Sequence, residues 1–444
     1  MTRVLVRSYQ NPLALYTPES ASKKMGGNEG NLLYANGVAR TLSSSQNKVG
    51  YGYGTMHAAN DPDKYARRIN AEFDHFVLPL ANSFRASFSA GLKELTEIIK
   101  RLEIPVTLVG VGAQALSTSF DTGDFSMART GHQASLAGEE AVAHNEVVRN
   151  FCEAVLERSN EIGVRGQYTK EFLESIGIPS EKVRVIGCPS LFTWGPELRL
   201  YPKASTLSSK SRISLNFDHR VAGIDRVINA NFQRYRGLTA PVQDSKSIRA
   251  ILSGEDVHDL ERVNLGTPIH TAHPMYRARK VLYYPNPWGW IESFKDQDFT
   301  FGTRLHGNIA SILGGTPAHL LAHDSRTIEL AEFHGIPFTR YETDAEPPLA
   351  AELFERTDYT QFNMLQPERY ENFIDFLHMN GLHTIADEGG MAPSFDTRIA
   401  KGRKVGAIRP ESQSAAVRKW EEVSPKARKF VRRTARKVKQ TLAH

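Results

Sequence analysis

The sequence predicts an α/β protein in which two Rossmann-like domains face a cleft, followed by a basic C-terminal extension. Short β-rich runs alternate with helical patterns through most of the 444 residues, as is typical of α/β layering. A stretch rich in Pro, Ser, Thr and Lys at 201–212 divides these runs into two series. Because open α/β sheets bind ligands at the carboxyl ends of their strands, the cleft is the expected ligand site.

The first series is expected to form five strands and four helices. The strands are predicted at 4–9, 73–80, 106–112, 161–165 and 183–186, and the helices at 32–39, 91–102, 139–159 and 168–176. The second series has predicted strands at 213–217, 281–284, 299–301 and 318–321, and helices at 308–313, 328–334 and 370–379. We therefore expect an N-terminal domain at 1–205, a C-terminal domain with a closing helix at 206–385, and a flexible basic tail at 386–444.

The charge distribution excludes one class of function. The segment Lys401–His444 contains 14 Lys/Arg and 3 Asp/Glu, whereas the other 400 residues contain 41 and 46. The positive net charge therefore belongs to the tail, and the body of the protein is slightly acidic. This distribution argues against a nucleic-acid-binding protein, so no nucleic-acid partner is expected.

Cysteine content and hydropathy indicate a cytoplasmic protein. Cys152 and Cys188 are the only cysteines, so they are expected to be buried thiols of a reducing compartment. No apolar run approaches the ~18 residues that a membrane-spanning helix needs. Arg7 interrupts the apolar stretch that a signal peptide would need.

The strongest candidate site is a corner where a predicted strand ends at Phe301 and a helix begins near Gly307 or Asn308. Arg304 and His306 lie at this corner, two residues apart. The first backbone N–H groups of a helix favour an anion, arginine offers a fork for carboxylate or phosphate oxygens, and histidine moves a proton near pH 7. A structural role, with Arg304 paired to a carboxylate and His306 capping the helix, is about equally consistent.

Two further arginines follow predicted strands. Arg165 comes directly after the strand at 161–165, where it could hold a second negative group or serve the structure. Arg326 follows Asp324, which is expected to cap the helix at 328–334, and could face the cleft. For each arginine the two interpretations are about even.

Glycine and aromatic patterns give weaker candidates. Gly27, Asn28 and Gly30 belong to a glycine-rich turn that could cradle an anionic or sugar group, although it lacks the Lys-Ser/Thr ending of a nucleotide P-loop. The GxGxxA pattern at 110–115 is followed by loop-like residues, which argues against a dinucleotide site. Trp288 lies in an aromatic cluster at 283–290 that suits a sugar ring, but a structural role is favoured. No metal-ligand spacing is present, so no metal is expected.

The segment Arg304-Leu305-His306, with Gly315-Thr316-Pro317 and Asp324-Ser325-Arg326-Thr327 after it, resembles the polysaccharide pyruvyl transferase family. The resemblance extends over roughly 20–340 and includes the Arg165 segment, 187–192, 109–114, 329–337 and the glycine turn. The turn departs from the family pattern, since it reads Gly-Gly-Asn-Glu-Gly-Asn rather than the commoner Gly-Asp form.

This resemblance implies a fold similar to that of GT-B glycosyltransferases and the transfer of a pyruvyl group from phosphoenolpyruvate onto two hydroxyls of a sugar. It implies that Arg304, Leu305 and His306 contact phosphoenolpyruvate and that Arg165 is the matching arginine of the first domain. Phosphoenolpyruvate is then the donor substrate, a glycan or lipid-linked sugar is the acceptor, and no cofactor is expected. A nucleotide-sugar glycosyltransferase and a non-catalytic glycan-binding protein of the same fold remain alternatives.

The basic tail poses a separate question. Lys/Arg clusters alternate with apolar residues over 417–442, so the tail could form an amphipathic helix that Pro425 would break or kink. A solvated extension is somewhat favoured over attraction to anionic lipid at the inner face of the membrane.

Overall fold

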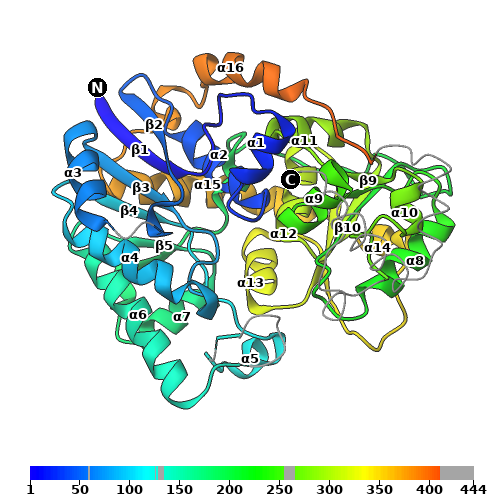
Figure 1. Ribbon diagram of the computed structural model, residues 1–444, viewed down its shortest axis with the longest axis horizontal. Helices are drawn as coiled ribbons and strands as arrows, with labels where there is room; N and C mark the ends of the chain where they lie inside the picture. The colour runs from blue at the N-terminus through cyan, green and yellow to red at the C-terminus, as the bar shows by residue number, and fades with distance from the viewer. Residues whose placement is uncertain (59–60, 126, 129–134, 255–265, 411–444) are drawn as a thin grey trace, which may run out of the picture.

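The computed structural model describes residues 1–58, 61–125, 127–128, 135–254 and 266–410 (Figure 1). These residues form two lobes, each built on a parallel β-sheet with helices packed against it. The structure thus confirms the predicted pair of Rossmann-like α/β units. The predicted tail helix over 417–442 lies outside the described residues.

The described residues of the first lobe form six strands. Strands β1 to β4 form a parallel sheet in the order β2-β1-β3-β4, and β5 pairs with β6. A bridge between Val111 and Val164 brings the second pair alongside β4. The strands are β1 Thr2–Ser8, β2 Asn47–Tyr53, β3 His75–Pro79, β4 Val106–Val109, β5 Ile162–Val164 and β6 Val183–Val185. The helices are α1 Pro18–Lys23, α2 Gly30–Thr41, α3 Pro62–Glu72, α4 Ser89–Lys100, α5 Ser117–Thr122, α6 Gly138–Leu156 and α7 Gln167–Ser175.

The second lobe repeats this arrangement. Its main sheet is parallel in the order β12-β11-β10-β7, and a bridge from Ser214 to Thr239 leads on to the parallel pair β8-β9. The strands are β7 Ile213–Asn216, β8 Ala240–Pro241, β9 Val281–Leu282, β10 Phe299–Gly302, β11 Ala318–Ala322 and β12 Phe338–Arg340. The helices are α8 Ile224–Arg234, α9 Ser245–Ser253, α10 Pro274–Arg277, α11 Pro287–Ser293, α12 Leu305–Leu313, α13 Ser325–His334 and α14 Ala350–Glu355.

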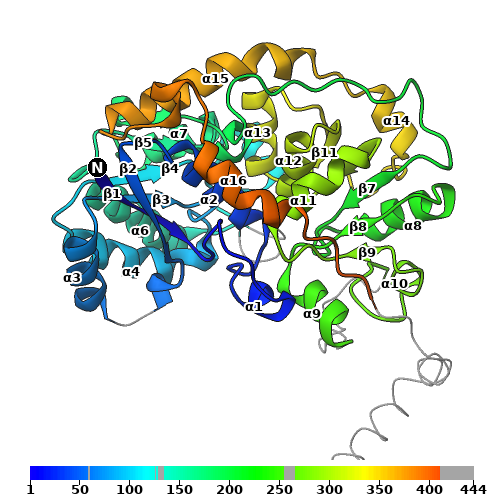
Figure 2. The same cartoon turned by 90° about the horizontal axis from the view of Figure 1, so that it is seen from above.

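The C-terminal helices tie the two lobes together. Helix α15 (Thr360–Met379) inserts Phe373, Phe376 and Leu377 into an apolar cluster with the β1 valines of the first lobe. Helix α16 (Pro393–Arg403) packs on α11, and its Asp396 forms an ion pair of 2.7 Å with Arg40 of α2. Figure 2 shows both helices crossing from one lobe to the other.

Two sequence predictions need correction here. The tail was expected to be flexible from residue 386, but α16 is folded because Phe395 and Ile399 are buried in the core of the second lobe. The residues after the GxGxxA pattern were expected to be loop-like, but 117–122 form the short helix α5. Cys152 and Cys188 are both free and buried, as predicted. Among the described residues, no helix is long and apolar enough to cross a membrane.

His334, the last residue of α13, provides a test of how the lobes are joined. Its buried Nε2 accepts a hydrogen bond of 2.8 Å from the backbone N–H of Cys188, in the segment that follows β6. Burial, with a further contribution from Arg369, lowers its pKa to about 3. The folded state therefore excludes a proton that the unfolded chain binds below about pH 6.5.

His334→Ala should lower the free energy of unfolding by about 2–4 kcal/mol at pH 7, because it leaves a cavity and an unpaired amide. The wild type should also lose stability as the pH falls from 6.5 to 5, and the variant should lose about 1–2 kcal/mol less over this range. Urea denaturation at both pH values measures both effects. Parallel pH curves for the two proteins would contradict this account of His334.

Candidate active site

A cavity of about 450 Å³ lies where loops at the carboxyl ends of both sheets meet. Gly26, Gly27, Asn28, Asn31, Asn82, Arg85, Ser87, Gln114 and Ala128 line it from the first lobe, and His219, Arg220, Asp244, Ser245, Lys246, Arg304 and Arg326 line it from the second. Five of these side chains are cationic, whereas Asp244 is the single acidic one. The cavity therefore suits an anionic ligand.

Arg304 lies in this wall because of the sharp corner between β10 and α12. Gly302 has φ +142°, and a Cβ there would lie 1.7 Å from the Asn216 carbonyl oxygen, so the corner requires glycine. Arg304 is the N-cap residue of α12, and its backbone N–H donates to Asn216 Oδ1 at 2.8 Å. Its guanidinium lies 3.7 Å from a carboxylate oxygen of both Asp218 and Asp244. These contacts hold the guanidinium at the cavity.

His306 lies deeper than the sequence suggested. It is 9 % exposed and is not among the residues that line the cavity, because its ring packs against α2 at Gly30. A Cβ on Gly30 would come within 2.7 Å of His306 Nδ1, which explains the glycine at this position. The ring also lies edge-on to Tyr34, and its Nε2 is 3.9 Å from Cys188 Sγ.

Arg165 reaches the same region from the first lobe. It follows β5 and is 1 % exposed, and its Nε donates to the carbonyl oxygen of Gly110 at 3.1 Å. Its guanidinium lies over the ring of Tyr34, 5.3 Å from the ring centroid. Its buried Nη2 has no hydrogen-bond partner in the described part of the chain. Like His306, Arg165 is not among the residues that line the cavity.

Three arginines act electrostatically on His306. Burial, together with the charges of Arg165, Arg326 and Arg304, lowers the pKa of His306 well below its ordinary value. The imidazole is therefore neutral near pH 7, and any imidazolium formed there would be a strong acid. The site therefore combines concentrated positive charge with a neutral imidazole.

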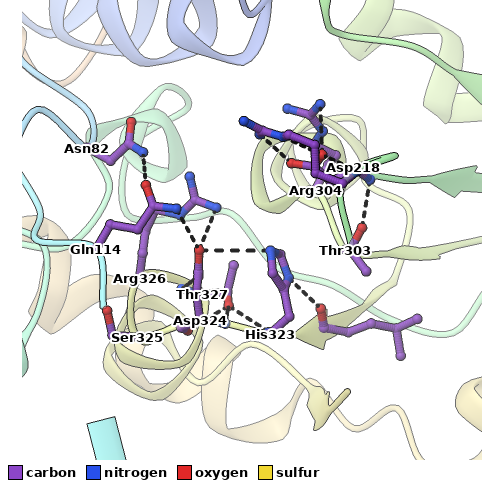
Figure 3. Close-up of polar contacts among 12 residues, drawn as sticks. Asn82, Gln114, Asp218, Thr303, Arg304, His323, Asp324, Ser325, Arg326 and Thr327 are labelled. Atoms are coloured by element: carbon purple, nitrogen blue, oxygen red, sulfur yellow. Dashed lines mark hydrogen bonds and ion pairs between the residues drawn. The ribbon is translucent and has the colours of Figure 1, made fainter. Parts of the chain in front are cut away.

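Asp324 connects this centre to the first lobe (Figure 3). Its buried carboxylate caps α13 by accepting the Thr327 N–H at 2.9 Å, and it lies 3.0 Å from Arg326 Nη2. Gln114 of the first lobe donates to the same carboxylate at 3.4 Å and accepts a bond from Asn82 at 2.8 Å. Asp324 thus has the predicted cap role, and Arg326 lines the cavity.

Several predicted ligand residues instead support the corner. Leu305 is buried in the apolar core, and Asn308 is fully buried and donates to the carbonyl oxygens of Gly302 and Arg304. Gly307 packs so closely against Asn216 and Gln243 that a Cβ there would lie 2.6 Å from the side chain of Asn216. These three residues shape the corner that positions Arg304, and none of them lines the cavity.

Some residues of the glycine turn line the cavity and another packs on His306, whereas Trp288 does neither. Gly27 and Asn28 line the cavity, whereas Gly30 packs on His306. Trp288 lies in the core beside Phe395 of α16, where its indole N–H donates to the Pro12 carbonyl oxygen at 2.8 Å. Trp288 is thus buried away from the cavity, in the structural role that the sequence analysis favoured for the aromatic cluster.

Five ionisable residues that line the cavity were not predicted from the sequence: Arg85, His219, Arg220, Asp244 and Lys246. His219 and Arg220 directly follow the predicted strand at 213–217, and Arg85 lies in a polar cluster after the strand at 73–80. Their position after strands was a usable signal. Burial would raise the pKa of Asp218, but Arg304 and Arg220 together hold it well below its ordinary value. Among the described residues, no group of three His, Cys, Asp or Glu side chains could hold a metal ion.

The structure is thus a two-lobed α/β fold with a positively charged cavity where the lobes meet. A family model described as polysaccharide pyruvyl transferase matches residues 60–325, more than half of the chain, and the chain belongs to this family. It is therefore a transferase. The match contains Arg165, Arg304 and His306, whereas the glycine turn precedes it and Arg326 directly follows it.

Comparison with solved structures gives distant similarities. S. aureus MnaA with UDP is 10 % identical (TM-score 0.40), and the alignment covers 85 % of this chain and 98 % of MnaA. Anabaena HepE with UDP and glucose is 13 % identical (TM-score 0.40), with 87 % and 99 % covered. Methanocaldococcus jannaschii UDP-GlcNAc 2-epimerase is 10 % identical (TM-score 0.40), with 85 % and 99 % covered. No curated protein sequence matches the chain.

The cap and charge roles of Asp324 can be separated by two substitutions. Asp324→Ala removes both the acceptor for Thr327 and the partner of Arg326, and should lower the free energy of unfolding by about 2–4 kcal/mol. Asp324→Asn keeps a capping oxygen, so it should cost about 1–2 kcal/mol less than the alanine variant. Urea denaturation of both variants measures the difference. Equal losses would show that capping by Asp324 does not stabilise α13.

Proposed function

We propose that the enzyme transfers the pyruvyl group of phosphoenolpyruvate onto two hydroxyls of a sugar in a cell-surface polysaccharide or its precursor, forming a cyclic ketal. The observation that carries this proposal is a cluster of positive charge, in which Arg304 and Arg326 line the cavity and Arg165 lies over the Tyr34 ring that His306 contacts edge-on. Membership of the pyruvyl transferase family supports the reaction class. The choice of donor follows from the charge of the site.

Phosphoenolpyruvate matches this site because it carries a carboxylate and a phosphate on a small carbon frame. Arginine binds both groups through paired N–H donors. The arginines repel one another and any proton on His306, so a multiply charged anion would relieve this repulsion. The cavity of about 450 Å³ leaves room for a sugar hydroxyl beside such a donor.

The reaction needs one proton on carbon and two bonds from oxygen. A proton adds to the methylene carbon of phosphoenolpyruvate, which makes C2 electrophilic, and the first sugar hydroxyl attacks C2. The C2–O bond to phosphate then breaks, the second hydroxyl closes the ketal, and inorganic phosphate leaves. The two sugar hydroxyls together release two protons. These balance the proton added to the methylene carbon and the proton taken up by the departing phosphate.

Two histidines suit the proton transfers. His306 has a depressed pKa, so its protonated form is a strong acid for delivery to the methylene carbon. His219 lines the cavity and lies 3.9 Å from Asp244, and burial lowers its pKa, so it is a neutral base beside the acceptor. The arginines hold the donor and stabilise the departing phosphate.

His306→Ala should reduce ketal formation by at least about 100-fold, because it removes the proton donor. Arg165→Lys should raise the KM for phosphoenolpyruvate about 10-fold or more, because lysine cannot reproduce the guanidinium fork. The assay follows phosphate release and glycan-linked pyruvate. His378→Ala, on the part-exposed face of α15, is the matched control and should stay fully active. A fully active His306→Ala enzyme would refute the proposed role of His306.

We further propose that the acceptor is lipid-linked and that the basic tail contacts anionic lipid at the inner face of the membrane. The concentration of Lys and Arg after residue 401 supports this proposal. The full chain should sediment with vesicles containing anionic lipid in low salt, and a chain ending at residue 410 should remain in the supernatant. Equal recovery of both proteins in the supernatant would remove the membrane role.

A further inference from the structure

A second, narrower cavity adjoins the cleft at the carboxyl ends of β1 and β3. Its volume is about 50 Å³, and Gly26, Asn31, Asn82 and Arg85 line both this cavity and the cleft. One water needs about 10–15 Å³ of such space, so the narrow cavity admits a compact group of a few heavy atoms and excludes a sugar ring. We call it the β1/β3 subsite.

Two guanidinium groups line this subsite, and neutral groups hold both of them. Arg7 is 5 % exposed, and its Nη2 donates to the Gly54 carbonyl oxygen at 2.6 Å and to His57 Nδ1 at 2.9 Å. Its buried Nε has no hydrogen-bond partner in the described part of the chain. Arg85 donates through Nε to Ser87 and through Nη1 to Asn82. These hydrogen bonds therefore fix both guanidinium groups before any ligand binds.

Among the described residues, no carboxylate forms an ion pair with Arg7 or Arg85. The other cleft arginines do have such partners, since Arg220 pairs with Asp218, Arg304 lies between two aspartates and Arg326 pairs with Asp324. Burial and the nearby charge of Arg326 lower the pKa of Arg85 to about 10. The subsite therefore holds positive charge that the described protein groups leave uncompensated.

His57 does not supply negative charge and does not compete for an anion. Burial, followed by the charge of Arg7, lowers the pKa of His57 to about 4. The imidazole is therefore neutral at pH 7, and its Nδ1 accepts a hydrogen bond from Arg7. Burying unpaired positive charge costs free energy. An anion in the subsite would offset this cost, which is the physical reason for expecting one.

The β1/β3 subsite is adjacent to the catalytic centre. Tyr34 lines the subsite, and the same ring lies beneath Arg165 and edge-on to His306. A group bound in the subsite would therefore lie near the ring that both Arg165 and His306 contact.

We propose that the β1/β3 subsite binds a phosphate group of a substrate, with Arg85 as its accessible ligand and Arg7 as its buried one. The identity of that substrate rests on the proposed function. The phosphate could belong to phosphoenolpyruvate, where it is the leaving group, or to a glycan acceptor that carries phosphate. The two sources share the same recognition chemistry, a compact oxyanion held by two guanidinium forks.

Calorimetric titration of inorganic phosphate into the full chain tests the subsite without any turnover. Arg85→Gln should weaken phosphate binding about 10- to 100-fold, since a hydrogen bond to a charged group is worth about 1.5–3 kcal/mol. Arg85→Lys should weaken phosphate binding less than Arg85→Gln does, because lysine keeps the positive charge. Arg68→Gln, an exposed arginine of α3 paired with Glu72, is the matched control and should bind like the wild type. Wild-type affinity in both Arg85 variants would overturn the proposal.

Steady-state kinetics then identify the source of the phosphate. If the donor supplies it, Arg85→Gln raises the KM for phosphoenolpyruvate and weakens product inhibition by phosphate with every acceptor. If the acceptor supplies it, the KM rises only for a phosphate-bearing glycan and not for the same glycan without phosphate. If no pyruvyl transfer occurs while phosphate binding still depends on Arg85, the proposed function fails and the subsite stands.

Discussion

The repulsion among buried and half-buried arginines at the meeting point of the two lobes is the constraint on which the rest of this site depends. Arg165 comes from the first lobe, and Arg304 and Arg326 come from the second. Such a cluster is costly unless carboxylates or a ligand compensate it. Asp218, Asp244 and Asp324 balance the arginines of the second lobe, whereas the Nη2 of Arg165 has no partner among the described residues. The positive charge that no described carboxylate balances therefore lies on the side of the first lobe, where a bound anion would compensate it.

The same charges explain the state of His306. An imidazole in water has a pKa of about 6.5. The imidazole of His306 is buried near guanidinium groups that disfavour its protonation, so its pKa is lowered. An anionic donor would partly cancel these charges and allow the imidazole to carry a proton when the donor is bound. Proton transfer would thereby be coupled to donor binding, which limits unproductive chemistry in the empty site.

Much of the fold and the core of the site could be predicted from sequence, because both depend on local patterns. The strand at 299–301, the corner at Arg304 and the cap at Asp324 follow from alternation, strand ends and capping chemistry. Strand β2 was missed because Gly50 and Gly52 weaken its β pattern, although Gly50 packs closely on Phe73. The depth of His306 and the burial of Trp288 depend on packing between lobes and with α16, which no local pattern encodes. Arg85 and His219 follow predicted strands, which was a usable signal, but only the fold shows that these strand ends meet at one cavity.

In the proposed reaction, this site protonates the methylene carbon of an enol phosphate and joins its C2 to two sugar oxygens. The most direct test is NMR of a reaction in D₂O that contains the enzyme, [3-¹³C]phosphoenolpyruvate and a glycan acceptor. The account predicts a ¹³C methyl signal that carries one deuterium, attached to the glycan as a ketal, together with one inorganic phosphate for each ketal formed. An unchanged phosphoenolpyruvate signal under conditions in which a nucleotide sugar is consumed would contradict it.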